Sequence, residues 1–162
     1  RVEFLEGPAL EFQPSPAWYH AVLCIGASFA LGDFDSAVAW MRRAMKPEGV
    51  LAIGEPFLHE WPLPNAARST APPWASSLRD LPGTVEALEA HGLELTGFIA
   101  ASLDDWDAYY SAQWSAAYAW ARENPSHSGR GEVLAQTRQA RESYLRWDRR
   151  YTGWGIFIAR AA

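Results

Sequence analysis

The chain has 162 residues, of which 49% are hydrophobic and 20% are charged, which is the size and composition of one folded domain and not of a disordered chain. Lys and Arg number 14 against 19 Asp and Glu, so the net charge of −5 excludes the positive excess that nucleic-acid binding requires. The single cysteine, Cys24, excludes both an intrachain disulfide and a cysteine-based zinc cluster.

Three apolar stretches in the first third of the chain predict strands. Residues 2–5 predict a strand that starts at the first residues of the sequence, with no loop before it. We therefore expect part of the domain to precede it. Residues 21–25 and 50–53 are uniformly apolar, which is typical of strands buried on both faces in a parallel sheet.

A helix is predicted between the second and third of these strands. Asp33 and Asp35 are suitable N-cap residues for it. Residues 45–49, which include Pro47 and Gly49, form a turn pattern that ends it. The succession of strand, helix and strand predicts a βαβ unit with a right-handed crossover.

The second half of the chain predicts a loop followed by helices and strands. Residues 57–79 contain four prolines without any periodicity and predict a long loop or lid. After it we expect a helix at 84–91, a strand at 93–100, helices at about 104–123 and 131–150, and a last strand at 154–159. The whole pattern predicts an α/β fold.

Two predicted strands end in residues suited to a ligand site. Ligands of open α/β sheets bind outside the carboxyl ends of the strands. Gly26 follows the first of these strands and would let a ligand approach the backbone closely. Glu55 follows Gly54 at the end of the other and would place a carboxylate at the mouth of the crevice. The alternative is that both glycines form tight turns and Glu55 is a solvated loop acid.

Other functional classes lack their motifs. The sequence contains no phosphate-binding P-loop, no Gly-x-Gly-x-x-Gly, no zinc-protease helix and no Gly-x-Ser-x-Gly elbow. The four histidines are scattered without metal-ligand spacing, so no metal site is expected. The apolar runs are far shorter than the roughly 20 residues that span a bilayer, and we expect a cytoplasmic protein without a membrane partner.

Several segments resemble the class I S-adenosylmethionine-dependent methyltransferases. These are residues 19–32 (YHAVLCIGASFALG), 45–50 (MKPEGV), 51–57 (LAIGEPF), 144–148 (YLRWD) and 151–157 (YTGWGIF). The resemblance implies a Rossmann-like, three-layer α/β/α sheet whose final strand is antiparallel. It covers the back part of the family domain, so residues 1–162 are predicted to be one partial domain, without the first strands and the glycine-rich loop. This partial domain includes the loop at 57–79 and a helical, cap-like insertion at 104–150.

The resemblance also implies a function and a set of site residues. The cofactor would be S-adenosylmethionine, and the partner a small-molecule methyl acceptor. Glu55 would act as the catalytic base or as an orienting group. The remaining predicted residues are Ala9, Leu10, Cys24, Ile25 and Gly26 for the cofactor, and Ser28, Phe29, Trp61, Trp114 and Tyr118 for the acceptor.

One departure from the family pattern weakens the expected cofactor site. The family usually has Gly-Asp-Ala where this chain has Gly7, Pro8 and Ala9, so the carboxylate that bonds the adenine amino group is replaced by a ring without an N–H. With the glycine-rich loop outside the sequence as well, we expect the chain alone to be unstable or to bind the cofactor poorly.

Two questions stay open on the sequence alone. Trp106, Tyr110, Trp114 and Tyr118 recur every four residues, either as a lid over the acceptor or as a stripe that packs two amphipathic helices together. The function is either catalytic methyl transfer or that of a non-catalytic, methyltransferase-like binding subunit. A nucleotide oxidoreductase on a related sheet is a third, weaker hypothesis, and the oligomeric state is not predicted.

Overall fold

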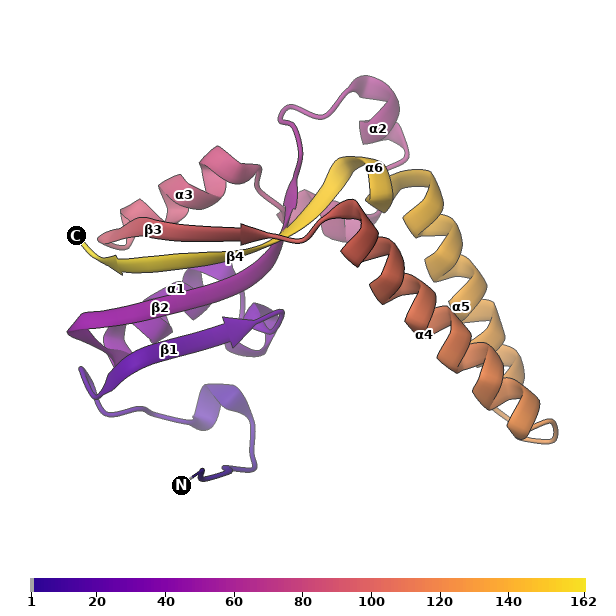
Figure 1. Cartoon of the computed structure of the whole chain (residues 1–162), viewed down its shortest axis with the longest axis horizontal. Helices are drawn as coiled ribbons and strands as arrows, with labels where there is room; N and C mark the ends of the chain where they lie inside the picture. The colour runs from indigo at the N-terminus through magenta and orange to yellow at the C-terminus, as the bar shows by residue number, and fades with distance from the viewer. Residues whose placement is uncertain (1) are drawn as a thin grey trace. The chain divides into compact units, whose positions relative to one another are not determined.

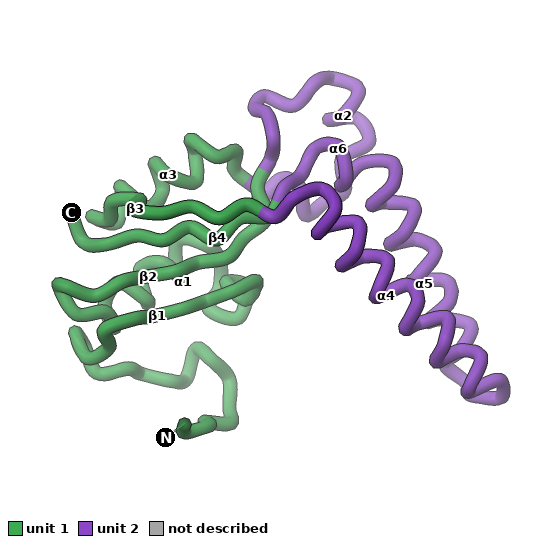
Figure 2. Tube along the Cα trace, viewed as in Figure 1, with its two compact units in different colours: residues 1–57, 79–100, 154–162 green, residues 58–78, 101–153 purple. Residues whose placement is uncertain are grey.

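The computed structural model describes residues 2–162 and divides the chain into two compact units (Figure 2). The first unit comprises Arg1–Phe57, Arg79–Ala100 and Trp154–Ala162 and contains the sheet. The second unit comprises Leu58–Leu78 and Ala101–Gly153 and is mainly helical.

A mixed sheet of four strands forms the first unit (Figure 1). The strand order is β1-β2-β4-β3, with β1 parallel to β2 and β3 antiparallel to β4. The bounds are Tyr19–Ile25 for β1, Met45–Leu58 for β2, Leu93–Ala100 for β3 and Thr152–Ala161 for β4. These strands confirm the predicted parallel pair, the Rossmann-like sheet and its antiparallel last strand.

Helices α1 (Phe34–Ala44) and α3 (Leu81–Ala90) share one core with the sheet. The Asp33 carboxylate accepts a hydrogen bond from the backbone N–H of Ser36 at 2.8 Å, which confirms the predicted N-cap of α1. Val38 and Met41 of α1 are completely buried and belong to the same cluster as Leu51 of β2. The apolar face of α1 therefore fixes the helix on the βαβ unit.

The prediction that both parallel strands are buried on both faces is wrong for β1 and holds only in part for β2, where Val50 and Ala52, on the face opposite Leu51 and Ile53, are partly buried. Leu51 and Ile53 of β2 are fully buried, and the strand lies between β1 and β4. In β1, Val22 is buried but Leu23 is 67% exposed and Ile25 is 47% exposed. Val22 faces the core that β1 shares with α1, whereas Leu23 and Ile25 lie on the opposite face of the strand, which is largely exposed.

Two predicted features near β1 and β2 are wrong. Residues 2–5 are not a strand, because none of the described strands pairs with them and an unpaired segment cannot complete its backbone hydrogen bonds. The turn predicted at 45–49 lies inside β2. Pairing jumps from Tyr19 with Met45 to Ala21 with Val50, so β2 accommodates three extra residues as an irregularity in the strand.

A pair of long helices forms most of the second unit. They are α4 (Leu103–Glu123) and α5 (Arg130–Ser143), close to the predicted ranges, although the predicted second helix does not run unbroken to residue 150. A π-helical turn, Tyr144–Asp148, follows α5, and α6 (Arg149–Tyr151) leads into β4. Tyr144, Trp147 and Asp148 of this turn are buried, at the i, i+3 and i+4 spacing that places side chains on one face of a helix.

The segment predicted as a loop at 57–79 contains two short helices. These are α2 (Asn65–Ser69) and a 3-10 helix, Pro73–Ser77. Ala67 and Ala75 pack with Trp147 in a second, smaller core, and the Trp147 Nε1–H donates to the Ala67 carbonyl at 2.9 Å. This contact joins residues 80 positions apart, so local sequence pattern does not reveal it.

Two leucines on neighbouring strands test the burial pattern of the sheet. Replacing the fully buried Leu51 by Ala should lower the free energy of unfolding by about 2–5 kcal/mol, because a cavity forms in the core. The matched change Leu23→Ala, at an exposed position of β1, should cost less than about 1 kcal/mol. Urea unfolding followed by circular dichroism measures both, and equal losses would contradict the one-sided burial of β1.

Candidate functional site

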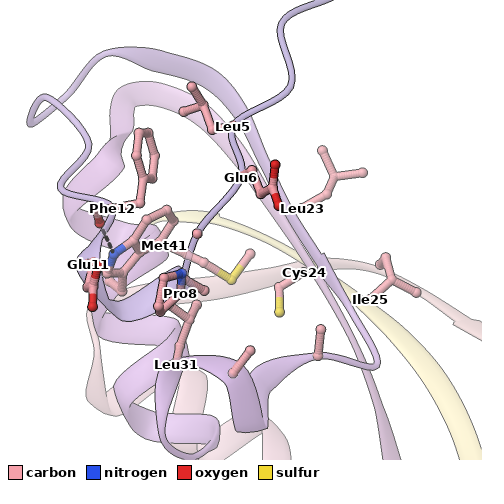
Figure 3. Close-up of a pocket in the computed structure, with 15 residues that line it drawn as sticks. Leu5, Glu6, Pro8, Glu11, Phe12, Leu23, Cys24, Ile25, Leu31 and Met41 are labelled. Atoms are coloured by element: carbon pink, nitrogen blue, oxygen red, sulfur yellow. Dashed lines mark hydrogen bonds between the residues drawn. The ribbon is translucent and has the colours of Figure 1, made fainter.

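A pocket of about 630 Å³ lies at the carboxyl end of β1 (Figure 3). Its walls come from residues that precede β1, from the end of β1, from the short helix that follows, and from α1. The lining is mostly apolar, and its charged members are Glu6 and Glu11. The carboxyl end of a parallel strand is where ligands of open α/β sheets bind, so this pocket is the candidate site of the first unit.

The pocket contains three of the five residues predicted to bind the cofactor. Ala9, Cys24 and Ile25 line it. Leu10 and Gly26 are outside its lining, and the Leu10 side chain is 60% exposed. Their role in cofactor binding stays a prediction.

Aromatic residues that the sequence did not place in the site form one wall of the pocket. The ring centroids of Phe12 and Trp40 lie 6.0 Å apart, and the Trp40 Nε1–H donates to the Phe12 carbonyl at 3.3 Å. Both residues line the pocket. Trp40 belongs to the predicted helix, but its contact with a residue 28 positions earlier has no local sequence signal.

Gly26 and Gly54 lie next to the Trp154 side chain of the same chain. The Gly26 N–H donates to the Gly54 carbonyl at 2.8 Å, and Gly26 has φ +63°, which glycine adopts without strain. A Cβ at Gly26 would lie 2.9 Å from Trp154 Cη2, and one at Gly54 would lie 3.2 Å from Trp154 Cζ2. Both glycines therefore make room for the Trp154 indole, which the sequence reasoning missed.

Glu55 and Ser28 are brought together by the fold. Glu55 lies within β2 and is partly buried, so it is not a solvated loop acid. Burial raises the pKa of its carboxyl group, while hydrogen bonds from the side chain and backbone of the buried Ser28 lower it to a smaller extent. The Glu55 Oε1 atom is buried and has no hydrogen-bond partner among the residues that the structure describes. The next predicted residue, Phe29, is 77% exposed.

Cys24 connects the pocket with Glu55. Burial raises the pKa of the Cys24 thiol, and the negative charge of Glu55 raises it further. A hydrogen bond from the backbone of Ala27 acts in the opposite direction. The thiol is thus kept protonated next to a carboxylate, and it is a weak nucleophile in this setting.

The predicted acceptor residues Trp61, Trp114 and Tyr118 belong to the second unit. Trp61 is 64% exposed. Trp114 lines a groove of about 250 Å³ between α4 and α5, and the Tyr118 hydroxyl accepts from Arg141 Nη1 at 3.5 Å. Their role in acceptor binding stays a prediction.

The aromatic residues of the second unit pack against one another. The rings of Tyr110 and Tyr144 stack with centroids 4.0 Å apart, and Trp114 meets Tyr144 edge-on at 5.8 Å. Burial, followed by the charge of Asp148, raises the pKa of the Tyr110 hydroxyl to about 12. These contacts agree with the alternative in which the stripe joins two amphipathic helices.

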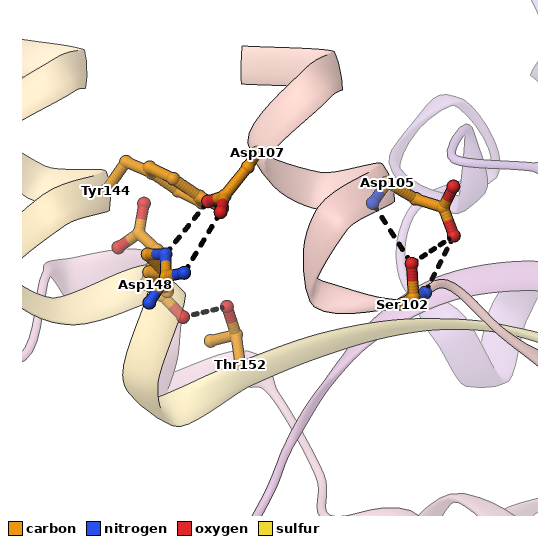
Figure 4. A network of polar contacts seen from close by, with 7 residues as sticks. Ser102, Asp105, Asp107, Tyr144, Asp148 and Thr152 are labelled. Atoms are coloured by element: carbon orange, nitrogen blue, oxygen red, sulfur yellow. Dashed lines mark hydrogen bonds and ion pairs between the residues drawn. The ribbon is translucent and has the colours of Figure 1, made fainter. Parts of the chain in front are cut away.

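Asp107 anchors the start of α4 to the residues after α5 (Figure 4). Its carboxylate accepts from Arg149 at 2.9 Å and 3.0 Å and from the Tyr144 hydroxyl at 2.6 Å. These bonds, that of Arg149 first, lower the pKa of Asp107. Every charge in this network has a partner, which indicates a structural role within the second unit.

Residues 2–162 are the part of the chain that the structure describes. In that range no group of three or more His, Cys, Asp or Glu side chains is placed to hold a metal ion. No helix in the same range has the length and apolarity needed to cross a membrane.

The single cysteine reports on the neighbouring carboxylate. Replacing Glu55 by Gln removes the charge that disfavours the thiolate, so the pKa of Cys24 should fall and alkylation by iodoacetamide at a fixed, mildly alkaline pH should become faster. Mass spectrometry of the intact chain follows the rate. Glu48→Gln, at an exposed position of the same strand, is the control and should leave the rate unchanged. An unchanged rate in the Glu55 variant would show that the two groups do not interact.

No protein-family model matches the sequence. Solved structures of known proteins, however, have a similar fold. An S-adenosylmethionine-dependent methyltransferase from Geobacter sulfurreducens, crystallised with S-adenosyl-L-homocysteine, is 27% identical with a TM-score of 0.86; the match covers 100% of this chain and 65% of that one. A methyltransferase from Thiobacillus denitrificans, crystallised with the same compound, is 28% identical with a TM-score of 0.84 over 98% of this chain and 64% of that one.

A sequence relative comes from Escherichia coli K12. The uncharacterised protein YjhP is 31% identical over 140 residues, which are 85% of this chain and 56% of YjhP. The chain therefore spans less than two thirds of the length of each of these relatives. The mixed sheet, its antiparallel last strand and these similarities show that the chain has the fold of the class I S-adenosylmethionine-dependent methyltransferases.

Proposed function

We propose that the protein transfers a methyl group from S-adenosylmethionine to a small-molecule acceptor. The observation that carries the proposal is the pocket at the carboxyl end of β1, in a chain whose structural relatives at 27% and 28% identity were crystallised with S-adenosyl-L-homocysteine. Because the chain spans less than two thirds of those relatives, the proposal concerns the full-length protein.

The residues of the pocket suit part of such a cofactor. When bound, S-adenosylmethionine supplies an electrophilic methyl group on a sulfonium centre. The apolar lining, with Pro8, Ala9 and Ile25, offers contact to a flat base, and Glu6 and Glu11 place negative charge beside it. We assign Ala9, Cys24 and Ile25 to cofactor contact, because each of them faces this pocket.

Glu55 is the proposed base on the acceptor side. It shares a strand face with Leu51 and Ile53, since residues two apart point the same way, and hydrogen bonding from Ser28 lowers its pKa. Methyl transfer depends mainly on alignment and on the exclusion of water. A partly buried carboxylate at this position can orient the acceptor or take its proton.

A second candidate function is a methyltransferase-like subunit that binds a ligand without catalysis. Pro8 favours it, because the family's usual carboxylate at this position is absent and proline donates no backbone hydrogen bond. The two functions differ in one measurement. A non-catalytic subunit would bind S-adenosyl-L-homocysteine and form none of it from S-adenosylmethionine with any acceptor.

A change at Pro8 tests the cofactor assignment of the pocket. Pro8→Asp should strengthen binding of S-adenosyl-L-homocysteine by the full-length protein about tenfold, because a hydrogen bond to a charged group becomes available. The backbone there, φ −62° and ψ 131°, is open to Asp. Isothermal titration calorimetry measures the affinity, with Pro8→Ala as the control for loss of the ring. Weaker binding by the Asp variant than by the Ala variant would contradict the assignment of the adenine to this part of the pocket.

A change at Glu55 separates catalysis from cofactor binding. Glu55→Gln in the full-length protein should lower kcat by about 100-fold or more, as expected for loss of a general base, while the affinity for S-adenosyl-L-homocysteine stays close to that of the unaltered protein. Turnover is measured as methyl transfer from labelled S-adenosylmethionine to a panel of amine, hydroxyl and thiol acceptors. Equal activity of the variant would discard the role of Glu55 as a base.

A further inference from the structure

The carboxylate of Glu55 is only half satisfied by the chain. Its Oε1 atom is buried without a partner among the described residues, and Ser28 lies close enough to lower the pKa of the carboxyl group through hydrogen bonding. None of the ion pairs in residues 2–162 involves Glu55. A buried carboxylate oxygen without a donor is costly, so this position is suited to a ligand that brings both a hydrogen and a positive charge.

We infer that Glu55 and Ser28 form a subsite for a protonated amine, so that the methyl acceptor is a nitrogen nucleophile that arrives as an ammonium ion. This inference rests on the proposed function and narrows its acceptor to one chemical class. Under this inference, the Oε1 atom, which accepts no hydrogen bond from the described residues, accepts one from the ammonium N–H. An anionic acceptor would be repelled by the same charge.

The surroundings of Glu55 favour a charged partner over a neutral one. Its neighbour on the same face of the sheet is Cys24, whose thiol is kept protonated and therefore adds no charge of its own. The rest of that face is apolar, with Leu51 and Ile53 fully buried. A low dielectric strengthens the attraction between a carboxylate and a cation, whereas a neutral hydroxyl gains only a hydrogen bond.

The same burial prepares the proton transfer that nitrogen requires before it can act as a nucleophile. One N–H bond of the ammonium breaks, its electron pair stays on nitrogen, and an O–H bond forms at the Glu55 carboxylate. Burial raises the pKa of the Glu55 carboxyl and lowers the pKa of an ammonium ion beside it. Both changes favour the neutral pair, carboxylic acid and free amine, over the two separate ions.

Three probes of matched shape test the subsite in the full-length protein with S-adenosyl-L-homocysteine present. They are propylammonium chloride, 1-propanol and sodium propionate, and their dissociation constants are measured by ligand-observed NMR. We expect propylammonium to bind about tenfold or more tightly than 1-propanol, as for a hydrogen bond to a charged group, and propionate not to bind. Equal binding of the amine and the alcohol, or preferential binding of propionate, would overturn the inference.

Variants and a direct titration locate the effect. Glu55→Gln should reduce propylammonium binding to the level of 1-propanol, and Glu48→Gln, on the same strand at an exposed position, should leave it unchanged. In the unaltered protein, the carboxyl ¹³C resonance of Glu55 should titrate at lower pH when propylammonium is added, since a bound cation favours the carboxylate. A Glu55 titration that does not move contradicts the subsite even if a variant fails to fold.

The same samples separate this inference from the function on which it rests. If S-adenosyl-L-homocysteine does not bind the full-length protein, the proposed methyl transfer fails. If it binds and the amine shows no preference over the alcohol, methyl transfer stands and the ammonium subsite fails.

Discussion

The parallel pairing of β1 with β2 fixes the positions of Cys24, Ile25 and Glu55. Val22 lies opposite Leu51 and Cys24 opposite Ile53, and the side chains of one face pack with α1 in a single core. Because side chains alternate along a strand, a slip of one residue would turn this whole set, with Glu55, to the other face. Burial of Leu51 and Ile53 therefore holds Glu55 on the face that Cys24 shares.

The chain turns sharply at the end of this pair, and the turn depends on two glycines. Gly26 extends the pairing by one hydrogen bond to Gly54 and then adopts a positive φ. The Trp154 indole fills the space that a side chain at either glycine would take. The core therefore packs against one face of the strand ends, and the Trp154 indole of β4 packs against the two glycines. Ser28 comes directly after this turn, and its hydrogen bonding lowers the pKa of the Glu55 carboxyl group.

The sequence predicted the elements whose signals are local. Two apolar runs, the Asp33 cap and the pattern of the long helices lead to the observed β1, β2, α1 and α4. The misses all depend on distant contacts. Residues 2–5 lack a partner among the described strands, and the short helices within 57–79 pack on Trp147, which lies far along the chain.

In the candidate site, too, the sequence predicted residues with a local signal and missed those placed by distant contacts. Cys24 and Glu55 were predicted from strand ends, and the structure brings them within electrostatic reach of each other. The walls formed by Phe12 and Trp40, and the place of Trp154, were not predicted. A strand end is a local property, whereas the identity of the side chain that packs onto it depends on topology.

Charge explains why an unpaired acid is useful at this position. On the proposed function, the donor carries a positive sulfonium, and an acceptor amine in water carries a positive charge as well. Two cations repel strongly in a site of low dielectric unless a negative group lies between or beside them. The Glu55 carboxylate first offsets the charge of the ammonium and then removes it by taking the proton. A glutamine at the same position would accept the same hydrogen bond, but it could neither offset the charge of the ammonium nor take its proton. Glu55 has Ser28 near it and forms none of the described ion pairs with an arginine or lysine, so its carboxylate is free to do both.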